Sequence, residues 1–321
     1  MAVLQAASEL VQTTIVFATA LVFAMLGGLV SERSGVVNIA LEGMMMAGAF
    51  TAAIVTHYLE TGAGLGASAP WIGFVCAIVM GALFSLPHAA ASITFRADQV
   101  VSGVALNLLA AGSTIYVCKI LLDGSAQTPT LKNVFSKWAV PLLSDIPYLG
   151  QALFIAYPTS YIAFLLVALI WFVLYKTPAG LRLRAVGEHP KAADSVAINV
   201  HRVRYAAVMI SGALAAMGGA TITLTTTSNF SHNTISGQGF IALAALIFGK
   251  WKPVAGMFAA LFFGIASALK SVFQVYGITN YIPVDFIYMF PYILTVLVLA
   301  GFVGRAVAPA AAGKPYRKGE R

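Results

Sequence analysis

Charged residues are scarce in this sequence: only 9% of its 321 residues are Asp, Glu, Lys or Arg, whereas 60% are hydrophobic. A soluble domain carries about 25% charged residues. The chain therefore lacks the polar surface that a protein needs in order to face water on all sides, and its mean hydropathy is +0.87. This composition excludes a soluble globular protein and indicates an integral membrane protein with little mass outside the bilayer.

Other absences narrow the possibilities further. Cysteine occurs only as Cys76 and Cys118, both in apolar segments, so the sequence predicts neither a disulfide framework nor a metal site. No Lys or Arg precedes the first apolar run, which has Glu9 instead, and we interpret that run as a retained span rather than a signal peptide. The Gly-x-x-x-x-Gly-Lys-(Ser/Thr) phosphate loop is missing, so ATP binding by this motif is not predicted.

Long apolar runs make up most of the chain. A bilayer core about 30 Å thick takes roughly 20 residues to cross as a helix. A shorter apolar stretch at 239–249 cannot cross alone, and we expect a half-span or a broken helix there. The sequence predicts an all-α polytopic helix bundle with about eight or nine transmembrane segments, or ten. The predicted spans are 11–30, 38–56, 71–94, 98–122, 157–175, 205–224, 254–275 and 281–303.

The basic residues gather in two segments, the connection 176–204 and the tail 305–321. Cytoplasmic loops carry an excess of Lys and Arg, so we predict a transmembrane domain over 1–304 with a cytoplasmic connection and a cytoplasmic C-terminal tail. The connections 57–70 and 225–238 lack Lys and Arg and are expected outside. The net charge of +8 therefore reports topology, and no nucleic-acid partner is predicted.

Three segments differ from ordinary membrane-spanning sequence. The first, residues 31–43, places Asn38 and Glu42 four residues apart, on one face of a helix. A carboxylate at this position is costly in lipid unless it faces a cavity, a partner or the interface. Two interpretations stay open: a residue of a transport pathway, or a Glu that pairs with Arg33 or caps a helix start.

The second segment, residues 180–200, combines basic residues with a short amphipathic helix. Pro190 suits the first turn of a helix, and the run 191–198 continues it. Such a helix can serve as a dock for another protein, or the segment can be a solvated loop that enforces topology.

In the third segment, residues 237–253, glycines bracket a short apolar run. Such a run occurs in discontinuous helices around a translocation path, or in a re-entrant segment whose only role is packing.

These three segments also resemble motifs of a known family. Residues 32–44 match a Glu-Arg-(Ser/Ala)-Gly-Val-Val-Asn-Ile-(Ala/Gly)-Leu-Glu-Gly-Met motif, and 239–251 match Gly-Phe-Ile-Ala-Leu-Ala-x-x-Ile-Phe-Gly-x-Trp. Residues 187–198 match Gly-Glu-Asn-Pro-x-Ala-Ala-(Asp/Glu)-x-x-Gly-Ile, except that His189 replaces the usual Asn and Ala197 the usual Gly. The chain thereby resembles the permease subunits of ABC importers in the ribose and branched-chain amino acid permease superfamily, in particular the nucleoside and simple-sugar subgroup.

The resemblance implies a multi-pass permease of the bacterial inner membrane that is no enzyme and holds no cofactor. Its implied partners are membrane lipid, a separate ATPase subunit, a second permease subunit that forms a heterodimer with this one, and an extracytoplasmic solute-binding protein. The resemblance assigns coupling to the ATPase to the following residues of the basic connection: Gly187, Glu188, His189, Pro190, Ala193 and Asp194.

The solute of such a permease is expected to pass along a polar lining. Hydroxyl and amide groups suit a neutral, hydroxyl-rich solute, although threonine hydroxyls often bond only to carbonyls of their own helix. The candidate lining residues are Asn38, Glu42, Asn107, Thr223, Thr225, Thr226 and Thr227.

Two other classes have less support in the sequence. An ion-coupled secondary transporter needs titratable groups within the membrane, and only Glu42 and Asp285 are suitably placed. A membrane-embedded enzyme would need a legible metal or nucleophile motif, but the five histidines are scattered without metal-ligand spacing.

Overall fold

The computed structural model describes residues 2–146, 149–275 and 307–318, together with the isolated positions 286, 289, 293 and 296. Most of these residues are helical. The predicted span 281–303 and Asp285 fall outside the continuous described ranges. The α-helices are α1 (Ala2–Arg33), α2 (Leu41–Thr61), α3 (Ala69–Phe84), α4 (Leu86–Ala89), α5 (Gln99–Leu121), α6 (Leu149–Leu153), α7 (Pro158–Lys176), α8 (Pro178–Glu188), α9 (Pro190–Ser195), α10 (Val200–Ile222), α11 (Gln238–Phe248) and α12 (Pro253–Val275).

Short irregular turns and one strand pair complete the described structure. Two π-helical turns, η2 (Ala90–Thr94) and η3 (Thr223–Thr227), extend the chain beyond α4 and α10, and a 3₁₀ turn, η1 (Gly66–Ser68), precedes α3. The strands β1 (Trp138–Ala139) and β2 (Ile155–Ala156) pair antiparallel, with Trp138 opposite Ala156. These two-residue strands are a small addition to the predicted all-α fold.

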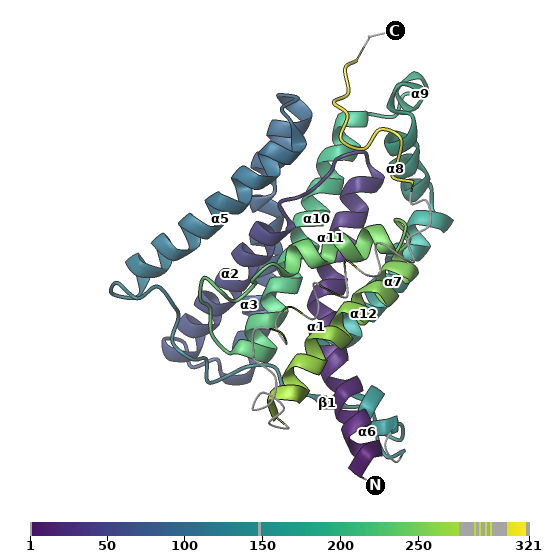
Figure 1. Ribbon diagram of the computed structural model, residues 1–321. Helices are drawn as coiled ribbons and strands as arrows, with labels where there is room; N and C mark the ends of the chain where they lie inside the picture. Colours follow the sequence, from purple (N-terminus) through teal and green to yellow (C-terminus); the bar gives the residue numbers. More distant parts are fainter. Residues whose placement is uncertain are drawn as a thin grey trace.

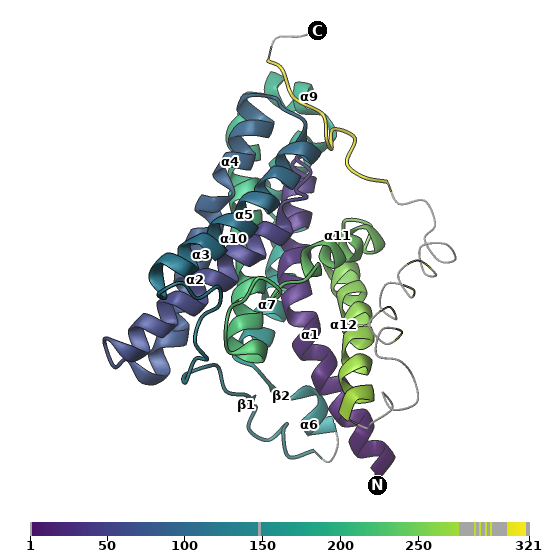
Figure 2. The ribbon, with the colours of Figure 1, turned by 60° about the vertical axis from the view of Figure 1, so that its left-hand side comes forward.

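Helices α1 and α10 form the centre of the bundle. In each, 83% of the most apolar 18-residue window is buried, against 22% in α5 and 33% in α7. Helices α2, α3 and α12 pack around this central pair, and α5 lies at the edge beside α2 (Figures 1 and 2). The apolar side chains that α5 exposes, Leu108 and Tyr116 among them, are suited to lipid or to another subunit.

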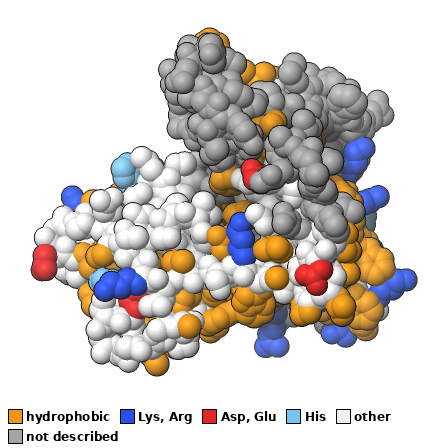
Figure 3. Space-filling view, turned by 90° about the horizontal axis from the view of Figure 1, so that it is seen from below, with side chains coloured by type: hydrophobic (Ala, Val, Ile, Leu, Met, Phe, Trp, Pro, Cys, Tyr) orange, Lys and Arg blue, Asp and Glu red, His pale blue; other side chains and the backbone are white. Residues whose placement is uncertain are grey.

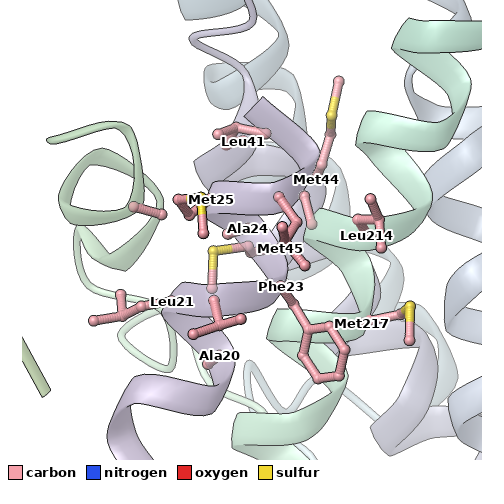
Figure 4. Close-up of a cluster of buried hydrophobic side chains, with 14 of the residues drawn as sticks. Ala20, Leu21, Phe23, Ala24, Met25, Leu41, Met44, Met45, Leu214 and Met217 are labelled. Atoms are coloured by element: carbon pink, nitrogen blue, oxygen red, sulfur yellow. The ribbon is translucent and has the colours of Figure 1, made fainter. Parts of the chain in front are cut away.

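Sulfur-containing and aliphatic side chains fill the space between α1, α2 and α10. Met25, Met44 and Met45 are fully buried there, with Phe23 beside them and Met217 contributed by α10 (Figure 4). Methionine is flexible enough to fill irregular gaps between helices. The core therefore lies where the central pair meets the start of α2.

Small residues allow these helices to approach closely. A Cβ added to Gly219 of α10 would overlap the carbonyl oxygen of Met45, and one added to Gly48 of α2 would overlap the backbone of Ala216. On the other side of α1, Gly256 of α12 packs against the flexible side chain of Met25 rather than against backbone. In lipid no hydrophobic effect drives helices together, so their association depends on the van der Waals contacts that close packing provides.

Five helical segments are long and apolar enough to cross a membrane: Ala7–Arg33, Gly66–Thr94, Gln99–Leu121, Pro158–Lys176 and Val200–Thr227. They coincide with five of the predicted spans and confirm an all-α multi-pass membrane protein. The predicted spans 38–56 and 254–275 correspond to α2 and α12, which are helices but do not meet the same criterion over their described residues.

The stretch 239–249 forms the separate short helix α11, as expected for a half-span. Its 11 residues extend about 16 Å at 1.5 Å per residue, about half of the bilayer core. In Figure 1, α11 lies across the bundle, whereas α12 runs along it. Lys250 and Trp251, both with positive φ, form the turn between them.

The two ends of the bundle differ in what they hold. The N-terminus, β1 and α6 lie at one end, whereas α8, α9 and residues 307–318 lie at the other (Figure 1). Viewed from the N-terminal end, the charged side chains on the described surface are few and scattered (Figure 3). The two basic segments of the sequence therefore share one end of the molecule.

The close contact at Gly219 leads to a test of the packing. We expect Gly219→Val to destabilise the bundle by about 1–3 kcal/mol or more, because the added side chain must push α2 away from α10. Gly112→Val in α5 is the matched control, since a Cβ there meets nothing within 4 Å. Thermal unfolding of the detergent-solubilised proteins measures both, and equal melting temperatures would contradict the packing argument.

Candidate translocation and coupling site

The connection between α1 and α2, residues 31–43, is the segment on which the site is built. Residues 34–40 are not helical, and Gly35 has φ +91°. Backbone amides and carbonyls inside a membrane protein need internal partners when they leave a helix. Ser31 supplies two of these partners, because its hydroxyl donates to the Val36 carbonyl at 2.7 Å and its own carbonyl accepts from the Val36 amide.

Helix α5 holds the middle of this connection. The Asn107 side chain accepts from the Gly43 amide at 2.7 Å and donates to the Ile39 carbonyl at 3.0 Å. The Gln99 side-chain oxygen accepts from the Val37 amide at 2.7 Å. A single amide side chain at position 107 therefore satisfies two backbone groups at the start of α2, the Ile39 carbonyl and the Gly43 amide.

His88 also binds the connection. Its Nε2 lies 3.1 Å from the Val37 carbonyl oxygen, and its Nδ1 lies 3.1 Å from the Ser102 hydroxyl. Because a carbonyl only accepts, Nε2 is the donor. The residue is 1% exposed. Its two bonds link α4 directly to α5 and to the α1–α2 connection.

Asn38 is fully buried and joins the connection to α10. Its amide nitrogen donates to the Ser211 hydroxyl at 2.8 Å, and its oxygen accepts from the Ala40 amide at 3.1 Å. The second bond closes a turn directly before α2, in the way that Asn side chains often shape backbone turns.

Glu42 binds the N-terminus of the short helix α11. One carboxylate oxygen accepts from the Gly237 amide at 2.6 Å, and the other accepts from the Gly239 amide at 2.7 Å. A helix N-terminus has unpaired amides and a partial positive charge, so a carboxylate there stabilises it. A Cβ at Gly239 would come within 2.5 Å of the Glu42 backbone, so only glycine permits this approach.

The far end of α11 is bound by the end of α1. Arg33 donates from Nε and Nη2 to the Trp251 carbonyl at 3.0 and 2.6 Å, and the Trp251 indole donates to the Glu32 carboxylate at 2.5 Å. Both ends of α11 are therefore held by the residues that flank the α1–α2 connection, with an acid at the N-terminus and a guanidinium at the C-terminal turn.

The four candidate threonines occupy the π-helical turn η3 at the end of α10. Thr223 is fully buried, and the Thr225 hydroxyl donates to the Thr221 carbonyl at 2.6 Å. Thr226 and Thr227 are exposed. Thr223 follows Ser211 by twelve residues, about 18 Å along a helix, so the threonines form a group separate from the three polar residues around α2.

The six coupling candidates occupy the joint between α8 and α9. Gly187 packs so closely on the α1–α2 connection that a Cβ there would overlap the Arg33 carbonyl. His189 separates the two helices, and Pro190 opens α9 as predicted. Glu188 and His189 are exposed, whereas Ala193 is buried in a cluster with Val186, Val200 and Tyr316.

Several residues of the site were not predicted from the sequence. Gln99, His88 and Ser211 are polar residues in or beside apolar runs, which is the signal that did identify Asn38 and Asn107. From the sequence, Arg204 counts only among the basic residues that indicate the topology, and Trp251 appears only as part of the motif at 239–251. Their partners lie far away in the sequence, so no local pattern indicates them. Among the described residues, no group of His, Cys, Asp or Glu could hold a metal ion.

Comparison with known proteins identifies the family. A family model described as the branched-chain amino acid transport system permease component matches residues 10–299, so the chain belongs to this family of transport components. The chain is 52% identical over the full length of both chains to the guanosine ABC transporter permease protein NupQ of Bacillus subtilis. It is also 42% identical to the nucleoside ABC transporter permease protein NupC of Lactococcus lactis, over 96% of both chains.

A relative with a different named solute is also found. The putative glucose ABC transporter permease protein TsgC13 of Haloferax volcanii is 35% identical over 82% of this chain and 77% of its own length. No solved structure matches the chain. Members of this family are permeases and not enzymes.

The bonds of Asn107 can be tested by a pair of substitutions. We expect Asn107→Ala to lower stability by about 1–3 kcal/mol, because the Gly43 amide and the Ile39 carbonyl lose their partner. Asn107→Asp keeps the acceptor for Gly43 and should have a smaller effect. Ser113→Ala in the same helix is the control, since its contact with the Ala110 carbonyl is 3.4 Å long. An Asn107→Ala melting temperature equal to that of the control would contradict the assignment.

Proposed function

We propose that this chain is the membrane-spanning permease subunit of an ABC importer that moves nucleosides across the bacterial inner membrane. The observation that carries the proposal is the 52% identity, over the whole of both chains, to a guanosine ABC transporter permease protein. The geometry agrees with that assignment, because the three motifs that indicated the family from the sequence meet around one segment. Simple sugars are the second solute class, favoured by the likeness to a putative glucose permease protein.

The proposed pathway is lined by two groups of polar residues at different heights of α10. The outer group is the η3 turn, where Thr226 and Thr227 expose their side chains and Thr223 and Thr225 support them. The inner group is Asn38, Glu42 and Asn107. Since these three side chains are bound to backbone groups, we propose that they fix the wall of the pathway, and that solute contacts the segment they hold.

The bonding of Glu42 favours an ABC importer over an ion-coupled transporter. A carboxylate that carries a proton or an ion through each cycle must be able to release its protein partners. Both oxygens of Glu42 instead accept from amides at the start of α11. Its role in this proposal is to hold a helix, and the energy for transport comes from a separate ATPase subunit.

The topology proposed for the chain has eight full spans and the short helix α11, which counts as a ninth crossing, with the N-terminus outside and the C-terminus in the cytoplasm. The five long apolar helices, the helices α2 and α12, and the predicted span 281–303 supply the eight full spans. The orientation follows from the basic residues of 176–204 and of the tail, which lie at one end of the molecule.

The proposed partners are an ATPase subunit, a second permease subunit and an extracytoplasmic solute-binding protein. The joint of α8 and α9, with Gly187, Glu188, His189, Pro190, Ala193 and Asp194, is the proposed contact with the ATPase. A heterodimeric permease is favoured because a second guanosine ABC transporter permease protein of Bacillus subtilis, NupP, also matches this chain. The two are 25% identical over 72% of this chain and 65% of NupP.

Uptake by the reconstituted importer tests the function. Vesicles that hold this chain, the second permease and the ATPase are expected to accumulate radiolabelled guanosine only when ATP and the binding protein are both present. An ATPase variant without its phosphate-loop Lys is the matched control and should abolish uptake. Uptake that survives without ATP hydrolysis, but stops when an ionophore collapses the ion gradients, would favour the ion-coupled alternative instead.

Competition in the same vesicles identifies the solute class. We expect an excess of unlabelled guanosine or uridine to lower the uptake of labelled guanosine at least about tenfold, because a competitor well above its Kd occupies most of the binding sites, and ribose or glucose to have little effect. The reverse ranking would assign the chain to sugar transport and would leave its class as an ABC permease intact.

A further inference from the structure

The C-terminal segment Pro309–Lys318 is folded against the α8–α9 joint and the α1–α2 connection. The Ala311 amide donates to the Gly187 carbonyl at 2.9 Å, and the Gly313 amide donates to the Gly35 carbonyl at 3.3 Å. Both views of the ribbon show this segment beside α9 at the end of the bundle (Figures 1 and 2). The sequence had indicated only a basic tail, and these bonds make residues 309–318 part of the folded protein.

Arg204 fastens this segment from inside the bundle. The guanidinium is 1% exposed, and it donates from Nε to the Ser34 carbonyl at 3.2 Å and from Nη1 to the Lys314 carbonyl at 3.2 Å. Burying a guanidinium is costly unless its donors are bonded; Nε and Nη1 are bonded here, whereas Nη2 has no hydrogen-bond partner among the described residues. Arg204 therefore ties α10, the α1–α2 connection and the C-terminal segment together at one point.

Tyr316 provides the second anchor. Its side chain is 6% exposed and packs with Val186, Ala193 and Val200, and its ring centroid lies 5.6 Å from that of His201. Its hydroxyl is hydrogen-bonded to the Asp194 carboxylate. Burial, followed by this bond and the charge of Asp194, raises the pKa of the Tyr316 phenol, so the hydroxyl remains a donor at neutral pH.

The C-terminal segment donates hydrogen bonds to both acidic side chains of the α8–α9 joint. The Glu188 carboxylate accepts from the Ala310 amide at 3.1 Å, and Asp194 accepts from Tyr316. The basic side chains of the same surface are solvent-exposed: Lys191 of α9 and Lys314, Arg317 and Lys318 of the C-terminal segment. The surface offered to a partner at this end is therefore positively charged.

A groove runs between the two parts of this surface. It has a volume of roughly 350 Å³, with Glu188, His189 and Lys191 on one side and Lys314, Pro315 and Arg317 on the other. Neither part forms the groove alone. A partner that docks on the α8–α9 joint must therefore also meet the C-terminal segment.

We propose that residues 309–318 and the α8–α9 joint form one composite docking surface, which fits an acidic patch on the ATPase subunit. This inference rests on the proposed function, since it assigns a further part of the chain to the partner already proposed. In it, Glu188 is a positioning residue that holds the C-terminal segment in place, and the lysine and arginine side chains meet the partner's carboxylates.

Charge reversal at the exposed positions tests the surface. In the full complex, Lys314→Glu combined with Arg317→Glu is expected to lower the amount of ATPase that copurifies with the permease, and ATP-driven uptake with it, about tenfold at low salt. The difference from the wild type is expected to shrink at high salt, which screens both the original attraction and the introduced repulsion. The control is Lys132→Glu, an exposed lysine in the connection that leads from α5 to β1, the strand at the opposite end of the bundle. Thermal unfolding of each permease confirms that the variants are folded.

The outcomes separate this inference from the proposed function. Copurification and uptake equal to those of the control, in a complex whose wild type is active, would overturn the inference and leave the proposed function standing. Normal copurification, with a loss of uptake that appears only in reconstituted vesicles containing anionic lipid, would also overturn it and would assign the surface to the membrane. A wild-type complex without ATP-driven uptake would contradict the proposed function itself.

A double-variant cycle tests the role of Glu188. If Glu188 acts by holding the C-terminal segment, Glu188→Arg and Tyr316→Ala both release that segment, and their combined effect on uptake equals that of the stronger single variant. If Glu188 touches the ATPase independently of the segment, the two losses multiply, and that result would overturn its positioning role. Glu188→Gln, which keeps an acceptor for the Ala310 amide, is expected to retain more uptake than Glu188→Arg.

Discussion

The structure depends on how the irregular backbone between α1 and α2 is satisfied. Residues 34–40 leave the helical path inside a bundle of spanning helices, where an unpaired amide or carbonyl costs several kcal/mol. Side chains supply the missing partners, and they come from three other helices: His88 from α4, Gln99 and Asn107 from α5, and Ser211, by way of Asn38, and Arg204 from α10. The placement of these helices therefore follows from one short segment.

This constraint also explains why a short helix can exist beside the segment. An 11-residue helix in lipid has eight end groups that lack partners within the helix and little length over which to recover the cost. Glu42 binds the amides at the start of α11, and Arg33 binds the carbonyl of Trp251 just beyond its end. The same connection that needs partners from the other helices thus supplies them to α11.

The sequence was informative about local features and much less so about the partners that those features have. Apolar runs predicted five spans that coincide with long apolar helices, and the glycines around 239–249 predicted a short helix, because hydropathy and helix breaking are local properties. Asn38, Glu42 and Asn107 were conspicuous because polar side chains are costly in apolar runs. That Glu42 would cap α11, and not its own helix, depends on residues 195 positions away and has no local signature.

The C-terminal segment is a second part of the chain whose fold has no local signature in the sequence. Its composition, rich in Lys, Arg and Ala with glycine and proline, is typical of a solvated tail and predicts only a cytoplasmic location. Its fold is specified by Arg204 and Tyr316, two residues whose environment becomes apolar only after α8, α9 and α10 have packed together.

The position of the connection bears on how force could reach the pathway. Gly187 of the proposed ATPase contact and the Arg33 carbonyl are in direct contact, and nine residues after Arg33 the same stretch of chain ends at Glu42, which holds α11. A shift of the α8–α9 joint must either deform this packed segment or move it as a unit. Because its backbone bonds are made by five elements at once, movement as a unit breaks fewer of them, and α11 would move with it. Coupling between distant sites requires a packed element that has two arrangements, with its hydrogen bonds satisfied in each.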